Sequence, residues 1–143
     1  MDERVKAAIF RAVSSEPLAR TLGMELVELS DGHSRVRMMY DPDTMANIYR
    51  RAHGGAIFSL LDEAFETVSQ TDGTICVALN VNITYLRSPG EKGLLFAEAE
   101  RISETRKTAA YTIMVTDEAG NLVAASQAVA YRTGKPIPFL DAG

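Results

Sequence analysis

Hydrophobic and polar residues alternate along most of this chain, and one long apolar segment interrupts the alternation near the middle. A period of two is typical of β-strands whose two faces meet different surroundings. The alternating segments are residues 24–29, 34–40, 75–87, 94–102, 108–116 and 122–131. Asp31-Gly32 lies between the first two and residues 117–121 between the last two, so each pair is predicted to form a hairpin. The pattern predicts an antiparallel sheet of five to six strands.

The apolar interruption predicts a long helix from about Gly55 to Ser69, which stops before Asp72-Gly73. Aliphatic residues and alanine dominate its first ten positions, so most of this helix is expected to be buried. One long apolar helix combined with an antiparallel sheet indicates the α+β class, with the sheet wrapped round the helix.

The N-terminal part predicts two short helices before the sheet begins, within residues 3–22. Residues 3–13 carry apolar side chains at helical spacing, and Pro17 fits the first turn of a second helix that Gly23 would end. Residues 41–52 are predicted to be a loop. No repeat or linker divides the sequence, so residues 1–143 are expected to form one domain with its core in residues 23–134.

Composition narrows the class of protein. The 143 residues are 46% hydrophobic and 24% charged, as expected of one globular domain. The net charge of −4 shows no basic excess, which argues against a nucleic-acid binder. The first 20 residues contain no long apolar run, so the sequence predicts neither a signal peptide nor a membrane span, and a cytoplasmic location.

Cysteine and histidine are rare in this sequence. Cys76 is the only cysteine, which excludes an internal disulfide and suits a reducing compartment. His33 and His53 are the only histidines, and Cys76 and these two histidines lack the spacing of zinc ligands. The sequence therefore predicts no metal site and no cofactor.

The start of the long helix carries the most suggestive chemistry. His53-Gly54-Gly55 leads directly into the helix, which holds Asp62 at its centre. The glycines allow close approach of the backbone where unpaired N–H groups point outward. A carboxylate in a mostly buried helix is costly unless it has a function. Amide donors and a carboxylate are the parts needed to attack a carbonyl with water and to hold the resulting oxyanion.

Four features occur together in a fixed order. Asn47 lies six positions before His53, Gly54-Gly55 follows the histidine, Asp62 lies nine positions after it, and residues 82–89 read Asn-Ile-Thr-Tyr-Leu-Arg-Ser-Pro. In these features the chain resembles the hotdog-fold acyl-CoA thioesterases, in the branch of the phenylacetate-pathway thioesterase and human thioesterase superfamily member 2. The resemblance covers residues 22–134 and implies a hotdog fold and hydrolysis of acyl-CoA to free acid and CoA.

The resemblance also implies the catalytic residues. Asp62 would act as general base or as nucleophile, and the sequence does not separate these routes. The Gly54 N–H would polarise the thioester carbonyl, and Asn47 would orient the attacking water or that carbonyl. His53 would fix the start of the helix by hydrogen bonding, rather than act as a base. Glu63 is the rival carboxylate, but it lies about 100° round the helix from Asp62.

One substrate-binding candidate begins this helix, and five others follow it in the sequence. They are Gly55, Asn80, Arg87, Ser88, Arg106 and Lys107. The three basic residues are candidates for the phosphates of CoA, since guanidinium and ammonium groups bind phosphate. A serine found near the active site of some relatives falls on Ala78, and Asn80, expected on the same strand face, would replace it.

The spacing of the catalytic residues predicts a dimer. Asp62 lies eight positions after Gly54, which is about 12 Å along an ideal helix. The oxyanion donor and the base must both lie within roughly 3 Å of groups on one carbonyl. One chain cannot supply both, so an isologous homodimer with two shared sites is expected, with a dimer of dimers also open.

Two alternatives to a thioesterase follow from the same features. One is a non-catalytic acyl-CoA-binding module, against which Asp62 argues. The other is a hotdog hydratase, whose Asp/His dyad has no evident match because His33 and His53 are the only histidines. The sequence does not identify the acyl group.

Overall fold

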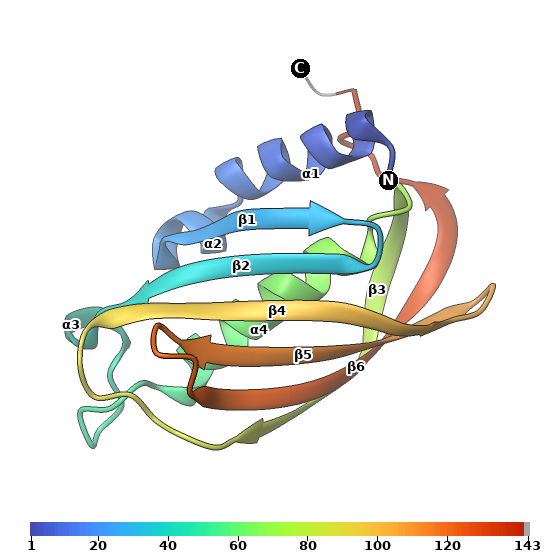
Figure 1. Cartoon of the computed structure of the whole chain (residues 1–143). Helices are drawn as coiled ribbons and strands as arrows, with labels where there is room; N and C mark the ends of the chain where they lie inside the picture. Colours follow the sequence, from blue (N-terminus) through green and yellow to red (C-terminus); the bar gives the residue numbers. More distant parts are fainter. Residues whose placement is uncertain (142–143) are drawn as a thin grey trace.

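The computed structural model describes residues 1–141, which form one antiparallel sheet folded round a long helix (Figure 1). The six strands are β1 (Met24–Ser30), β2 (His33–Tyr40), β3 (Thr74–Tyr85), β4 (Gly93–Glu104), β5 (Thr108–Asp117) and β6 (Leu122–Pro136). Their order in the sheet is β1-β2-β4-β5-β6-β3, so β1 and β3 are the edges. The predicted α+β arrangement and both predicted hairpins are confirmed.

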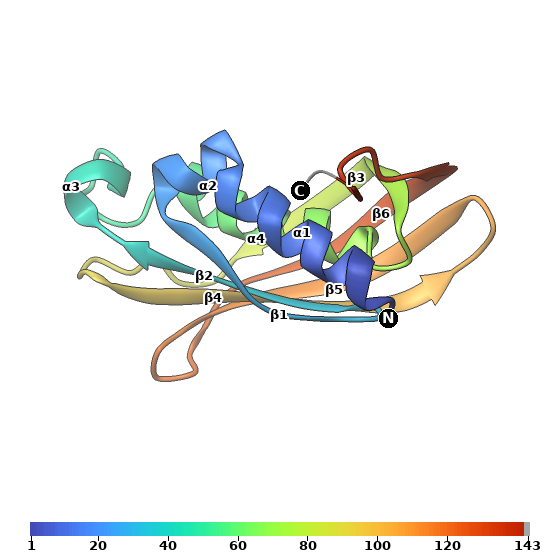
Figure 2. The same ribbon diagram turned by 90° about the horizontal axis from the view of Figure 1, so that it is seen from above.

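The long helix α4 (Gly54–Ser69) lies against the inner face of the sheet (Figures 1 and 2). Leu60, Leu61, Ala64 and Val68 are fully enclosed because they recur at the spacing that keeps one helix face against the strands. The Phe65 ring meets Tyr111 of β5 edge-on, with ring centroids 5.6 Å apart. This packing fixes the direction in which the start of α4 points.

Two N-terminal helices extend the core beyond β1, as predicted. The bounds are α1 (Glu3–Ser15) and α2 (Pro17–Leu22). The Asp2 side chain caps α1 by accepting hydrogen bonds from the N–H groups of Arg4 and Val5. Gly23 ends α2 with φ of +66°, a left-handed conformation that favours glycine. Among residues 1–141, no helix is both long and apolar enough to cross a membrane.

The predicted loop over residues 41–52 contains a short helix, α3 (Pro42–Met45). The Asp41 side chain accepts from the Asp43 N–H, and proline occupies the first turn. A β-bridge between Ala46 and Ala52 then closes the segment on itself. Four residues are too few to show helical periodicity, so the prediction of loop throughout was wrong, although Asp-Pro was a usable signal.

β3 is an edge strand with a bulge. Ala78 pairs with Ala130, whereas Asn80 pairs with Val129, so Leu79 is the extra residue. Cross-strand partners share a face, and adjacent residues of β6 face opposite ways. Ala78 and Asn80 therefore lie on opposite faces of the sheet. The prediction that Asn80 shares a face with Ala78 was wrong because the bulge reverses the alternation.

Candidate functional site

The first turn of α4 is held by the histidine that precedes it. His53 is the N-cap residue, and its Nδ1 accepts a hydrogen bond of 2.8 Å from the Gly55 N–H. A ring nitrogen that accepts carries no proton, so the neutral ring holds its proton on Nε2. A side chain on Gly55 would approach this cap, because its Cβ would lie 3.1 Å from Nδ1.

Gly54 is the first residue of α4 and directly follows the N-cap residue His53. Its C=O accepts a hydrogen bond from the Tyr85 hydroxyl at 3.1 Å, which ties the helix start to the end of β3. Its N–H has no intrahelical partner at this position, and no acceptor among residues 1–141 takes it. The structure thus presents one backbone donor at the positive end of α4.

A hollow of about 320 Å³ borders Gly54. It is lined by Asn47, Ala52, Gly54, Ile57, Tyr85, Leu86, Arg87 and Ser88. Four of the predicted site residues, Asn47, Gly54, Arg87 and Ser88, therefore meet here although they come from two segments of the chain. Tyr85 is a lining residue that the sequence analysis did not single out, although it lies within the motif at residues 82–89.

Asn47 holds its own loop with one end of its amide. Its Oδ1 accepts from the N–H groups of Tyr49 at 2.9 Å and Arg51 at 3.2 Å. Its Nδ2 donates to no group within residues 1–141, so the free end of the amide is a donor. Ser88 is fixed as well, because its Oγ donates to the Ala52 C=O at 3.0 Å.

Arg87 is the one predicted CoA-binding cation that lines this hollow. Its Nη1 lies 3.9 Å from Asp117 Oδ2, and both groups are reached by solvent. Hydrogen bonds from Asn121 are the main reason that the pKa of Asp117 is below its ordinary value, and Arg87 contributes least. The ion pair is loose, so the guanidinium keeps hydrogen-bonding capacity for a ligand.

Arg106 and Lys107 lie elsewhere. They form the turn between β4 and β5, at the opposite end of the sheet from the start of α4 (Figure 1). Lys107 Nζ lies 3.5 Å from the Tyr131 hydroxyl and 5.7 Å from the centre of its ring. Within one chain, neither residue is brought to the hollow beside Gly54. Asn80 faces away from α4, and its Oδ1 accepts from Asn82 Nδ2 at 2.7 Å.

The two carboxylates at the centre of α4 have different surroundings. Asp62 is exposed in the isolated chain, whereas Glu63 is only 3% exposed. The expectation that Asp62 is the buried carboxylate of this helix was therefore wrong for the single chain. Partial loss of water nevertheless raises the pKa of Asp62, and the negative charge of Glu16 adds to the shift.

Asp62 does not line the hollow beside Gly54. The helix is continuous from Gly54 to Ser69, so the separation of about 12 Å between the two residues holds in the structure. Glu63 faces Glu16 at the junction of α1 and α2, on another side of α4. One chain thus presents the donor and Asp62 at two separate places on its surface.

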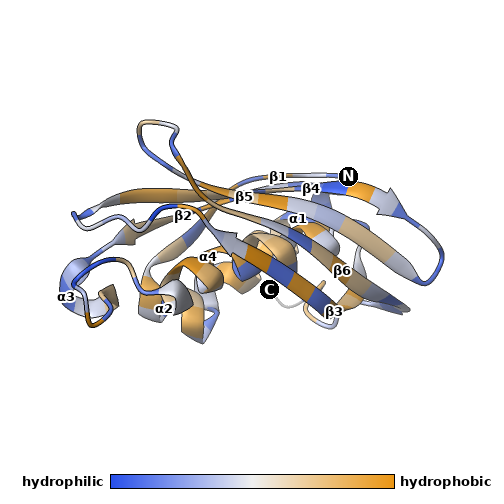
Figure 3. Cartoon of the chain, turned by 90° about the horizontal axis from the view of Figure 1, so that it is seen from below, coloured by the Kyte–Doolittle hydropathy of each residue, from blue (hydrophilic) through white to orange (hydrophobic). Residues whose placement is uncertain are grey.

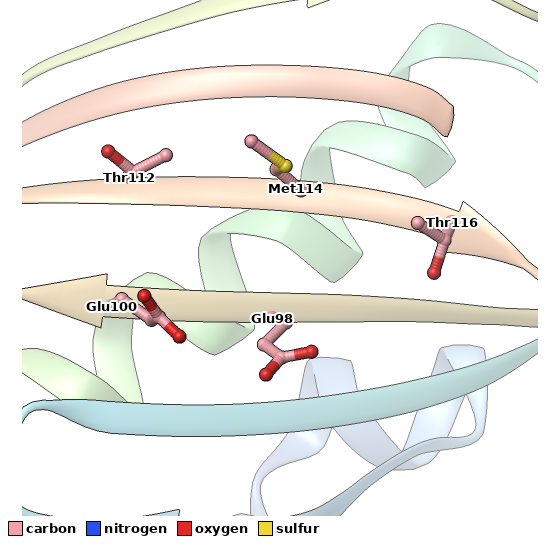
Figure 4. A pocket seen from close by; sticks show the side chains of 5 residues that line it. All are labelled: Glu98, Glu100, Thr112, Met114 and Thr116. Atoms are coloured by element: carbon pink, nitrogen blue, oxygen red, sulfur yellow. The ribbon is translucent and has the colours of Figure 1, made fainter. Parts of the chain in front are cut away.

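A second hollow lies on the outer face of the sheet, away from α4 (Figure 4). It encloses about 310 Å³ and is lined by Glu98, Glu100, Thr112, Met114 and Thr116. Glu98 is held by His33 Nε2 at 2.8 Å. Only strand side chains surround this hollow, so it lacks the backbone donor that a carbonyl would need.

Comparison with known proteins identifies the class to which this arrangement belongs. Residues 49–124 match the thioesterase superfamily, a segment that includes Gly54, Asp62 and Arg87. The chain belongs to the thioesterase superfamily. The acyl-coenzyme A thioesterase PaaI of Escherichia coli is 30% identical over 124 residues, which are 86% of this chain and 87% of PaaI. A protein of Archaeoglobus fulgidus is 33% identical over 138 residues, 96% of this chain and 87% of that protein.

Solved structures of the superfamily confirm the fold. The structure of Escherichia coli PaaI, from the phenylacetic acid degradation operon, superposes with a TM-score of 0.89 at 25% identity and covers 94% of this chain and 97% of its own. The structure of smu.793 from Streptococcus mutans, bound to acetyl-CoA, superposes with a TM-score of 0.75 at 30% identity and covers 80% and 91%. The predictions of a hotdog fold and of a PaaI-like thioesterase family are confirmed.

Proposed function

We propose that this protein hydrolyses acyl-CoA thioesters in a site that two subunits share. The observation that carries the proposal is the Gly54 N–H, which has no acceptor within residues 1–141 and belongs to a residue that lines a hollow at the positive end of α4. Support comes from PaaI, named as an acyl-coenzyme A thioesterase, and from the relative bound to acetyl-CoA.

In the proposed reaction, the thioester oxygen accepts a hydrogen bond from the Gly54 N–H. As water or a carboxylate attacks the carbonyl carbon, negative charge develops on this oxygen and the donor stabilises it. The free Nδ2 of Asn47 is the second donor at the hollow, so Asn47 would bind the carbonyl oxygen or fix the attacking water by donating to it. The C–S bond then breaks, and the CoA thiolate leaves and takes up the proton that the attacking water gave to the carboxylate. If the carboxylate itself attacks, the anhydride that it forms with the acyl group is hydrolysed by water to the free acid, and a proton of that water ends on the thiolate.

The carboxylate that activates water would be Asp62 of the partner subunit. The β3 edge supports a dimer because, among residues 1–141, no strand pairs with the side of β3 that faces away from β6, and it exposes large apolar side chains: Val77 is 48%, Leu79 60% and Tyr85 50% exposed. Figure 3 shows hydrophobic and hydrophilic residues alternating along this strand. Two antiparallel copies of α4 beside paired β3 edges would bring Gly54 of one chain to Asp62 of the other.

Arg87 would bind a phosphate of CoA at the mouth of the hollow. Phosphate suits a guanidinium, which can donate two parallel hydrogen bonds. Arg106 and Lys107 would contribute only if the partner's β4–β5 turn reaches the same hollow. Ser88 would act on substrate through the shape of the hollow, since its own donor is already used in the chain. Gly55 does not line the hollow, and its N–H donates to His53, so it would act only by holding the start of α4.

A thiol-release assay on a panel of acyl-CoAs tests the proposed function. Aryl-acetyl, medium-chain and long-chain thioesters should each be tried, because the sequence does not identify the acyl group. We expect at least one to be hydrolysed with kcat of about 1 s⁻¹ or higher, within the usual range for enzymes. Tight binding of acyl-CoA without hydrolysis of any member would instead identify a binding module.

A further inference from the structure

Three carboxylates from separate parts of the chain meet on one side of α4. Glu16 lies between α1 and α2, whereas Glu63 and Glu66 lie on α4. One ligand oxygen of each lies within 4.8 Å of the other two. Like charges at this separation repel strongly in a partly buried setting, so the cluster needs a counter-charge or protons.

Glu63 is the unusual member of the cluster. It is only 3% exposed, and its Oε1 is enclosed without a hydrogen-bond donor from residues 1–141. Buried polar oxygens almost always have a partner, and leaving one without a partner costs free energy. The arrangement therefore lacks a positive or donating group at this oxygen.

Glu16 also departs from its local role. It occupies the N-cap position of α2, where a side-chain oxygen would ordinarily accept from the helix N–H groups. Glu16 makes no such hydrogen bond and instead lies against the carboxylates of α4. If Glu16 capped α2, its carboxylate would turn away from those of Glu63 and Glu66.

We propose that Glu16, Glu63 and Glu66 bind a hard divalent cation, such as Ca²⁺ or Mg²⁺. Such ions prefer carboxylate oxygens and complete their coordination with water. A hollow of about 510 Å³ borders Glu16 and Glu66 and provides room for these waters and a path for the ion. Ser15, Arg11 and Phe139 also line it. The ion would tie the α1–α2 junction to α4, and this structural role does not depend on the proposed hydrolysis.

Thermal unfolding of the whole protein, first treated with a chelator, tests this site. CaCl₂, MgCl₂ and MnCl₂ are titrated separately against NaCl of equal ionic strength. At least one divalent cation should raise Tm by about 5 °C or more once its free concentration exceeds Kd about 100-fold. Isothermal titration calorimetry should show one ion per chain.

Substitutions of single carboxylates test which residues bind the cation. Glu63→Gln and Glu16→Gln should each weaken binding of the cation at least tenfold. Glu63 is buried, whereas Glu16 lies at the partly exposed α1–α2 junction, so Glu16→Gln removes a ligand without changing the core. Glu100→Gln is the matched control, because it alters the other cluster of potential ligands, formed with His33 and Glu98.

The proposal is overturned if no divalent cation raises Tm beyond the NaCl control. It is also overturned if Glu16→Gln and Glu63→Gln retain the full response, or if Glu100→Gln alone abolishes it. These measurements require no substrate, so their failure leaves the proposed hydrolysis standing.

Discussion

Gly54→Pro is expected to lower kcat by about 10² to 10³, while Gly54→Ala loses much less, because only proline removes the N–H that would hold the oxyanion. Proline is well suited to the first turn of a helix. The preceding residue, His53, already has the extended conformation that proline requires, with φ of −65° and ψ of 135°. The substitution therefore deletes one donor and leaves α4 intact.

Gly54→Ala is the matched control because it adds the same Cβ and keeps the N–H. That Cβ would lie 3.2 Å from Cζ of Tyr85, whose exposed ring can move aside. The measurement is kcat on the best acyl-CoA, with circular dichroism to confirm folding. Equal rates for the proline and alanine variants would show that this N–H stabilises no charge.

Asp62→Asn is expected to lower kcat by about 10² or more, with acyl-CoA binding retained, because asparagine keeps the shape and removes the charge that activates water. Asp43→Asn is a suitable control, since Asp43 is an exposed aspartate on α3. Steady-state kinetics and equilibrium binding of a CoA ligand measure the two effects separately. A near-normal rate in Asp62→Asn, with activity lost in Glu63→Gln, would identify Glu63 as the reactive carboxylate.

Local signals predicted most of the fold. The hairpin at Asp31-Gly32, the end of α2 at Gly23 and the apolar helix after His53 each depend on a few adjacent residues, so the sequence alone shows them. Short irregularities were missed. The four residues of α3 carry no periodicity, and one extra residue at Leu79 reverses the face of Asn80.

The candidate site was predicted less completely, because it depends on how the elements pack. Asn47, Gly54 and Arg87 were predicted together and do line one hollow. The burial of Glu63, however, depends on the side of α4 that faces the α1–α2 junction, which brings Glu16 against the helix. No local pattern indicates that contact, and none shows that Arg106 lies at the far end of the sheet.

The central claim is that each site combines Gly54 and Asn47 of one subunit with Asp62 of the other. Asn47→Ala and Asp62→Asn homodimers should each be nearly inactive, since every site in them carries a lesion. When the two variants are unfolded and refolded together in equal amounts, about half of the dimers are mixed. In a mixed dimer one site carries both lesions and the other carries neither.

The decisive measurement is the thioesterase activity of these refolded mixtures, after mass spectrometry has shown that mixed dimers formed. The shared site predicts recovery of about a quarter of wild-type activity. A mixture of Asn47→Ala with Gly54→Pro should show no recovery, because both lesions affect the same half of each site. If the mixture of Asn47→Ala with Asp62→Asn stays inactive, both residues act within one chain, which contradicts the shared site.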